Sequence, residues 1–309
     1  MNTDDEFELL DYEDAALPER ELATVQAWLK PTSYDDPSSE YRRHLAARVD
    51  QTGVWLRGTK KYQQWQKSDD HGFIWVKGAP GAGKSVLSAA VIGDLQTEEP
   101  HAHVLFFFFR QIVESNRYPA NLIRDWLAQL LPFSIALQGR LHALAKHRLL
   151  ADVSDEELWE ALLAGLQKVK LAYCIVDAMD EMDLANIDFL RRLNELALFR
   201  PGNVKVLMTS RPRPDLQSYL AAPSVVHVNL HEEEVGREVQ LFVSNRLERM
   251  ELDQGLQSTL TQDITSRSRG LFLYAEILCN EVQLALQNGQ TPDLSGLPPD
   301  ILDMVRKSP

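Results

Sequence analysis

The segment that most constrains this chain is GAPGAGKS at residues 78–85, directly after the apolar run FIWV at residues 73–76. It matches the pattern G-x-x-x-x-G-K-[ST] without a gap, and its glycines let several backbone N–H groups converge on one anion. An apolar strand, this loop and a helical pattern over residues 85–95 follow one another in the order that a phosphate-binding loop requires. A chance turn rich in Gly and Ala is the alternative, but it would not need those neighbours. The segment therefore predicts a polyphosphate site within an α/β fold.

The polar residues of this loop have distinct expected roles. Lys84 is expected to reach the β- and γ-phosphates of a nucleotide, and the Ser85 hydroxyl is expected to hold Mg²⁺. The helix that follows would direct the positive end of its dipole at the phosphates. The predicted nucleotide-binding residues are Gly78, Ala79, Pro80, Gly81, Ala82, Gly83, Lys84, Ser85 and Val86, together with Thr209 from a later strand.

Two further strand ends carry polar residues. In YCIVDAMDE, Asp177 closes an apolar strand, which places its carboxylate at the sheet edge beside the loop, where it would hold Mg²⁺ with Ser85. Asp180 or Glu181 is expected to orient the attacking water; spacing alone does not choose between them, and Asp180 is preferred. In VLMTSRP, Thr209 is placed to touch the γ-phosphate. Arg211 would stabilise transition-state charge or report the γ-phosphate, unless it is an ordinary surface residue. The predicted catalytic residues are therefore Asp180, Glu181 and Arg211, and the predicted metal ligands are Ser85 and Asp177.

Five short apolar segments predict strands. They lie at residues 73–77, 103–109, 171–177, 203–209 and 225–230. Helical patterns fill all but one of the gaps between them, and this alternation predicts a parallel three-layer α/β sandwich. Residues 41–67 are predicted to be helical. After residue 230 no strand is convincing, and three helical segments followed by a last short helix are expected there.

The length of 309 residues suggests two domains, or one large domain with an appendage. The acidic surplus is concentrated at the start, in DDEFELLDYEDAALPERE, and residues 31–40 are rich in Pro, Ser and Asp. We therefore predict an acidic N-terminal arm and linker over residues 1–40, a nucleotide-binding domain over residues 41–230, and a small helical domain over residues 231–309.

Composition argues against several classes of partner. The formal net charge of −13 does not favour nucleic acid. The longest apolar run, residues 104–109, is far too short to span a bilayer, and no secretory signal is visible. Cys174 and Cys279 lie in apolar runs and are predicted to be reduced core residues. We therefore expect a cytoplasmic protein with neither a nucleic-acid nor a membrane partner.

Together these motifs resemble those of the NACHT class of STAND nucleotide triphosphatases, and especially the fungal NLR-like proteins, over about residues 25–305. GAPGAGKS is similar to the Walker A motif of that class, IVDAMDE to its Walker B motif with two extra acids, and MTSRP to its sensor 1 strand end. The lead-in WLKPTSYDD…GVWLRGTKKYQQW is similar to that of fungal members. The resemblance implies the sheet order 5-1-4-3-2, followed by a helical domain. Phe272 departs from the pattern, because it stands where relatives in the wider class have the proline of a Gly-x-Pro element near adenine.

Function follows from the motifs and from the resemblance together. The absence of an [NT]-K-x-D stretch from the sequence favours adenine over guanine, so ATP or ADP with Mg²⁺ is expected. The resemblance implies a slow ATPase that acts as a switch, with domain rearrangement and homo-oligomer formation in the ATP state, in innate-immunity or heterokaryon-incompatibility signalling. Its partners would be other signalling proteins or the winged-helix and repeat domains that are usual in the class. This chain would then be a fragment of such a protein or a minimal member of the class. A nucleotide-bound scaffold without turnover is the alternative, and a metabolic kinase is disfavoured because no acceptor-site motif is present.

Overall fold

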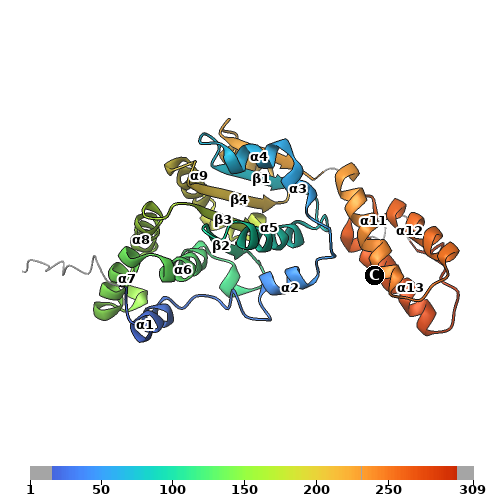
Figure 1. Cartoon of the computed structure of the whole chain (residues 1–309), viewed down its shortest axis with the longest axis horizontal. Coiled ribbons are helices and arrows are strands. Elements are labelled where there is room, and N and C mark those ends of the chain that lie inside the picture. Colours follow the sequence, from blue (N-terminus) through green and yellow to red (C-terminus); the bar gives the residue numbers. More distant parts are fainter. Residues whose placement is uncertain (1–15, 231, 298–309) are drawn as a thin grey trace, which may run out of the picture.

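The computed structural model describes residues 16–230 and 232–297 of the chain, and it is built around one parallel sheet (Figure 1). The strands are β1 (Phe73–Lys77), β2 (His103–Phe108), β3 (Ala172–Asp177), β4 (Val204–Ser210) and β5 (Val225–Asn229). They lie in the order β2-β3-β4-β1-β5, and all pairs are parallel. This is the predicted order read from the other edge, so the fold prediction is confirmed. Each strand end lies within one residue of its predicted position.

Helices cover both faces of the sheet, as its continuous apolar strands require. One face packs on α5 (Lys84–Glu98) and on α2 (Glu40–Ala46), α3 (Trp55–Gly58) and α4 (Lys60–Lys67). The other face packs on α1 (Glu19–Leu29), α6 (Pro119–Leu130), α7 (Ile135–His147), α8 (Asp155–Gln167), α9 (Phe189–Phe199) and α10 (Pro214–Tyr219). Alternate residues of β1 enter the two cores, with Trp75 on one side and Ile74 on the other. Burial of both faces fixes the register of the strands. The register in turn sets where each strand ends along the edge of the sheet.

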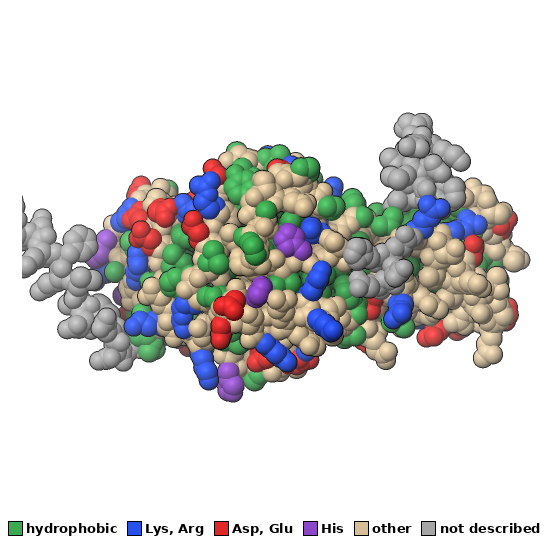
Figure 2. Space-filling view, turned by 90° about the horizontal axis from the view of Figure 1, so that it is seen from above, with side chains coloured by type: hydrophobic (Ala, Val, Ile, Leu, Met, Phe, Trp, Pro, Cys, Tyr) green, Lys and Arg blue, Asp and Glu red, His purple; other side chains and the backbone are tan. Residues whose placement is uncertain are grey.

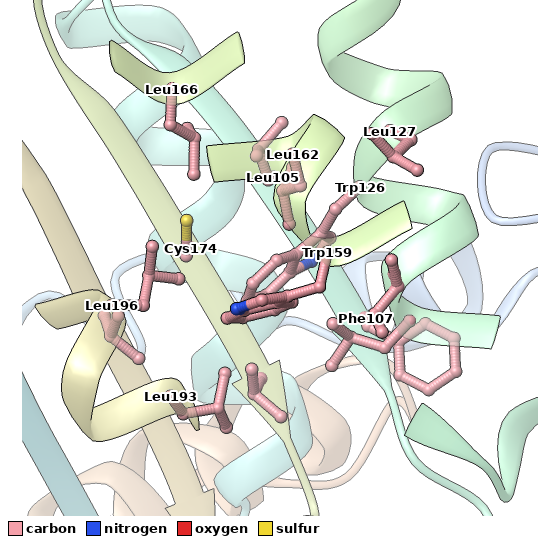
Figure 3. Packing of buried hydrophobic residues seen from close by; sticks show 14 of the residues in the cluster. Leu105, Phe107, Trp126, Leu127, Trp159, Leu162, Leu166, Cys174, Leu193 and Leu196 are labelled. Carbon is pink, nitrogen blue, oxygen red and sulfur yellow. The ribbon is translucent and has the colours of Figure 1, made fainter. Parts of the chain in front are cut away.

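The larger of the two cores lies on the face of the sheet opposite to α5. Trp126 of α6 and Trp159 of α8 pack with Phe107 of β2 and Cys174 of β3 (Figure 3). Helix α8 begins with a capping box, in which the Ser154 side chain accepts from the backbone of Glu157 and the Glu157 side chain accepts from the backbone of Ser154. Cys174 lies fully within this apolar core, and its burial raises the pKa of the thiol.

The prediction of helix across residues 41–67 is wrong in its middle. Three helices replace one, because the chain turns between α2 and α3 with positive φ at Gln51 and Gly53. The amide of Gly53 donates to the Glu238 carboxylate at 2.5 Å, so a partner far along the chain holds this turn. The apolar spacing of the segment carries no trace of that contact.

Part of the predicted arm and linker packs on the sandwich. Val25 and Leu29 of α1 are fully buried in the larger core. Thr32 donates from its backbone and its hydroxyl to the two oxygens of Asp125 in α6, at 2.6 and 2.5 Å. Residues 1–15, which carry most of the acidic surplus, lie outside the described residues.

Helices α11 (Glu232–Glu248), α12 (Gln254–Ser268) and α13 (Phe272–Gln287) form a separate cluster at one end of the molecule (Figure 1). Their shared core includes Val239, Ile264 and Leu278, each fully buried. The predicted last short helix falls beyond residue 297 and outside the described residues. On the face seen in Figure 2, acidic and basic side chains are interspersed over the sandwich. No helix among the described residues is long and apolar enough to cross a bilayer.

Candidate functional site

The glycine loop joins the end of β1 to the start of α5. Gly81 and Gly83 have φ of +76° and +81°, in the left-handed region that favours glycine. The amide of Gly78 donates to the carbonyl of Ser210 at 3.2 Å, which ties the start of the loop to the end of β4. The local sequence therefore produces the reversal of direction that a phosphate-binding loop needs.

The backbone of this loop fits an anion. Across residues 16–230 and 232–297, no carbonyl or side chain accepts from the amides of Gly83, Lys84 or Ser85. These three amides lie at the start of the fifteen-residue helix α5, whose dipole favours negative charge at that end. Lys84 Nζ donates to the carbonyls of Gly78 and Ala79 at 2.9 Å each, which places its ammonium over the loop. Burial lowers the pKa of Lys84, and the carboxylates of Asp180 and Asp177 oppose that shift.

Asp177 ends β3 beside the loop, with only 1% of its surface exposed. Its Oδ1 accepts from the Ser88 hydroxyl at 2.7 Å and from the Thr209 hydroxyl at 2.6 Å. Because Ser88 lies in α5 one turn after Ser85, this contact brings the carboxylate to the first turns of that helix. Oδ2 has no donor among the described residues. Ser85 and Asp177 thus offer the hydroxyl and carboxylate oxygens that Mg²⁺ takes beside phosphate ligands.

Thr209 lies near the end of β4 and bonds the Asp177 carboxylate. Its hydroxyl donates to Asp177 and accepts from the amide of Ala178 at 3.1 Å, and the residue is only 1% exposed. In the structure the hydroxyl therefore orients the carboxylate of Asp177, and the predicted γ-phosphate contact of this side chain stays a prediction. Ala178 has φ +52°, and this left-handed exit from β3 favours a small residue after the aspartate.

Asp180, Glu181 and Arg211 form one polar group at the ends of β3 and β4. Arg211 donates from its backbone to Asp180 Oδ1 at 2.9 Å, and its Nε lies 3.1 Å from Asp180 Oδ2. Glu181 accepts from the amide of Gln111 at 3.3 Å, and its Oε1 lies 3.9 Å from Arg211 Nη2. The structure therefore brings together all three residues that were predicted to be catalytic.

Helix α2 supplies polar residues that the sequence analysis missed. The His44 ring stacks on Phe108 with 5.8 Å between ring centroids, and Phe108 pairs in register with Asp177. His44 Nε2 lies 3.4 Å from Glu40, which also lies 3.3 Å from Arg110 Nη1. Burial lowers the pKa of His44, against the charges of Asp177 and Glu40. The only signal in the sequence was the spacing of Glu40 and His44 on one helix face.

A cavity of about 300 Å³ adjoins the glycine loop on the side of the helical cluster. Its walls come from the turn at Gly53, from the start of α5 and from α11 and α13, and they include Gly83, Glu238, Asn245 and Phe272. Asn245 Oδ1 is buried and has no partner among the described residues. The cavity is therefore built by segments that are nearly 200 residues apart in the chain.

The start of α13 packs directly on the glycine loop. The amide of Leu273 lies 3.4 Å from the carbonyl of Gly81, and a Cβ on Gly81 would meet the Leu273 Cβ at 2.9 Å. A Cβ on Gly83 would meet the Phe272 ring at 3.0 Å. These two glycines are therefore needed for close packing as well as for their backbone conformation.

Residues 51–211, just over half of the chain, match the family described as nephrocystin 3, N-terminal. The matched span contains the glycine loop, Asp177, Asp180 and Arg211. It also contains the turn at Gly53 that forms one wall of the cavity. The helical cluster lies outside it.

The vegetative incompatibility protein HET-E-1 of Podospora anserina is 24% identical over 261 residues, an alignment that covers 79% of this chain. The chain spans 19% of the length of that relative. Among solved structures, Cdc6p from Pyrobaculum aerophilum has a TM-score of 0.48 at 14% identity, covering 86% of this chain and 67% of the other. Domain III of the replication initiation protein DnaA from Thermotoga maritima has a TM-score of 0.45 at 12% identity, covering 81% and 91%.

Proposed function

Because the chain belongs to the nephrocystin 3, N-terminal family and has the motifs of a NACHT-like P-loop NTPase, we propose that it binds ATP and hydrolyses it slowly as a molecular switch. One observation carries the proposal. Three kinds of group converge at one edge of the sheet. They are the amides at the start of α5 that have no acceptor among the described residues, the Lys84 ammonium and the buried Asp177 carboxylate. This combination suits a polyphosphate with a divalent cation.

The phosphates would lie in the glycine loop. Amides of Gly83, Lys84 and Ser85 would donate to their oxygens, and Lys84 would neutralise the β- and γ-phosphates. Ser85 and Asp177 would hold Mg²⁺, with Ser88 and Thr209 orienting the carboxylate. When bound, Mg²⁺ would stabilise the negative charge on the phosphate oxygens.

Hydrolysis requires a water aimed at the γ-phosphorus. Attack by water forms a new P–O bond while the bond to the β–γ bridging oxygen breaks, and ADP leaves with that electron pair. A carboxylate at position 180 or 181 would orient the water and accept its proton, which passes to the released phosphate. Arg211 would stabilise the charge that develops on the γ-phosphoryl oxygens. The partial exposure of this corner, where Arg211 is 51% exposed, suits a slow reaction because water screens these charges.

The base and ribose would occupy the cavity beside the loop. Phe272 offers an aromatic wall there, in the place where the wider class has a proline. Asn245 Oδ1, which has no partner among the described residues, could accept from the N6 amino group of adenine, while the amide nitrogen of the same side chain could donate to N7. These contacts support ATP over GTP.

The switch would act through the junction between the sandwich and the helical cluster. We propose that residues 1–40, 41–230 and 231–309 are an arm and linker, a nucleotide-binding domain and a helical domain. Phe272 and Leu273 rest on the loop itself, so a change in the loop reaches α13 directly. A shift from mostly one state to mostly the other needs about 5.5 kcal/mol of differential affinity. Self-association in the ATP state, and a signalling role in the cytoplasm with other proteins or flanking domains, complete the proposal.

A nucleotide-bound scaffold without turnover is the second candidate. The clamping of Asp180 by Arg211 favours it, because a carboxylate with both oxygens engaged is poorly placed to orient water. Phosphate release by Glu181→Gln decides between the two candidates. Loss of turnover with retained binding supports the ATPase, and absence of turnover in the unsubstituted protein supports the scaffold.

The proposed function is tested by denaturing the purified protein and identifying the released nucleotide by chromatography. We expect ADP or ATP. Release of a guanine nucleotide would contradict the base assignment but keep the phosphate site. If no nucleotide is released and titration with ATP and Mg²⁺ shows no binding, the proposed function is wrong.

A further inference from the structure

We propose that Asp180 is a positioning residue that holds Arg211 in the absence of a γ-phosphate, and that Glu181 is the acid left to orient water. This inference rests on the proposed function of the same site. It reverses the preference for Asp180 stated in the sequence analysis, where spacing alone did not choose between the two acids. Asp180 would thereby help the protein to distinguish ATP from ADP.

The geometry of the clamp is two-pointed. Asp180 Oδ1 accepts from the Arg211 backbone at 2.9 Å, and Oδ2 lies 3.1 Å from the Arg211 Nε. The Asp180 side chain is only 5% exposed, so solvent does not compete strongly for its oxygens. Both oxygens of this carboxylate are thus committed to a single residue on the neighbouring strand end.

Glu181 has looser contacts. Its Oε2 accepts from the amide of Gln111 at 3.3 Å, and its Oε1 lies 3.9 Å from Arg211 Nη2. Its side chain is 30% exposed. Of the two acids, Glu181 therefore has the freedom to turn toward a water molecule without breaking a short ion pair.

The clamp is placed where a γ-phosphate would compete for the guanidinium. Arg211 directly follows Ser210, whose carbonyl accepts from the Gly78 amide at 3.2 Å, so the residue lies at the sheet edge beside the start of the loop. A phosphate carries more charge than a carboxylate and accepts two N–H groups of an arginine at once. ATP must draw Arg211 away from Asp180, whereas ADP has no γ-phosphate and leaves the clamp closed. Asp180 therefore reduces the affinity for ATP and leaves that for ADP unchanged.

The test is Asp180→Asn, which keeps an oxygen for the Arg211 backbone and removes the charge that attracts Nε. Binding is measured by titration calorimetry with Mg²⁺, using ADP and a non-hydrolysable ATP analogue. We expect the analogue to bind about three- to fivefold more tightly, as loss of a partly exposed ion pair predicts, with ADP affinity unchanged. Melting temperatures without nucleotide show whether the variant is folded.

A double-mutant cycle separates positioning from direct action. In an Arg211→Ala background, Asp180→Asn is expected to have no further effect on the affinity for the analogue. An equal effect in both backgrounds would overturn the inference, as would parallel changes in ADP and analogue affinity.

Turnover provides the second readout. Glu181→Gln is expected to reduce phosphate release without changing the ratio of analogue to ADP affinity. If Asp180→Asn abolishes release at unchanged affinities, Asp180 orients the water and the inference is wrong. If the unsubstituted protein binds neither nucleotide, the proposed function fails and this inference fails with it.

Discussion

The sandwich and the helical cluster contribute to the candidate site in different ways. The sandwich places Asp177 and Arg211 at the ends of strands whose two faces are buried, and it places Lys84 at the start of α5, after the loop that follows β1. The helical cluster touches the same site through a few contacts, chiefly Glu238 with Gly53 and Leu273 with Gly81. The groups expected to bind the phosphates and Mg²⁺ therefore all belong to the sandwich, whereas the base pocket is built where the two parts meet.

Removing the loop ammonium is the strongest way to test the sandwich side of this comparison. We expect Lys84→Ala to weaken ATP binding more than about 100-fold, because hydrogen bonds to charged phosphates are among the strongest in proteins. Calorimetry measures the affinity. Lys77→Ala is the matched control, because Lys77 ends β1 one residue before the loop and its Nζ lies over the Trp75 ring. Unchanged affinity in Lys84→Ala would rule out the phosphate assignment.

The carboxylate of Asp177 gives the next largest expected effect. Asp177→Ala should weaken ATP binding about 50-fold with Mg²⁺ and only about twofold with EDTA, because the carboxylate acts through the metal. Ser88→Ala removes one hydroxyl from the carboxylate but keeps its charge, and it should cost far less. Equal losses with and without Mg²⁺ would contradict the metal role.

Substitution of Asp125 tests whether the N-terminal segment that carries Thr32 is anchored independently of the nucleotide site. Burial raises the pKa of this carboxyl to about 7, while its bonds to Thr32 and the charge of Arg124 oppose the shift. Because the folded-state pKa lies above the unfolded one, the stability it contributes is complete below about pH 4 and is lost as the pH rises through 7. Between pH 5.5 and pH 8 the chain should lose about 2 kcal/mol of unfolding free energy that Asp125→Asn retains.

Urea unfolding at the two pH values measures this difference. Asp36→Asn, at an exposed position, controls for the change in net charge. Nucleotide affinity should stay the same in Asp125→Asn. If unfolding free energy depends on pH in the same way in the variant and in the unsubstituted protein, Asp125 does not titrate between these two pH values and the prediction is wrong.

The smallest effect concerns the junction. Phe272→Ala should weaken ATP binding about tenfold, as loss of a stacked aromatic predicts, and should leave binding of inorganic tripolyphosphate unchanged. Leu284→Ala, at an exposed position of the same helix, is the control. If tripolyphosphate binding falls as much as ATP binding, Phe272 supports the loop and the division between phosphate and base sites is wrong.

Local patterns in the sequence were enough to predict the strands and the glycine loop, whereas the order of the strands came from the family resemblance. A buried parallel strand needs a continuous apolar run, and a loop with open amides needs glycine, so both are visible in a few consecutive residues. Asp177 was also predictable, because a polar residue that ends such a strand must lie at the sheet edge.

Only the tertiary structure decided which polar groups pair at that edge. Thr209 bonds Asp177, and Arg211 clamps Asp180, across separations of about 30 residues. The Gly53 turn depends on Glu238, which lies 185 residues away. Such pairs depend on strand register and on the direction in which each chain leaves its strand. No local spacing records those quantities, because they arise only when distant segments pack together.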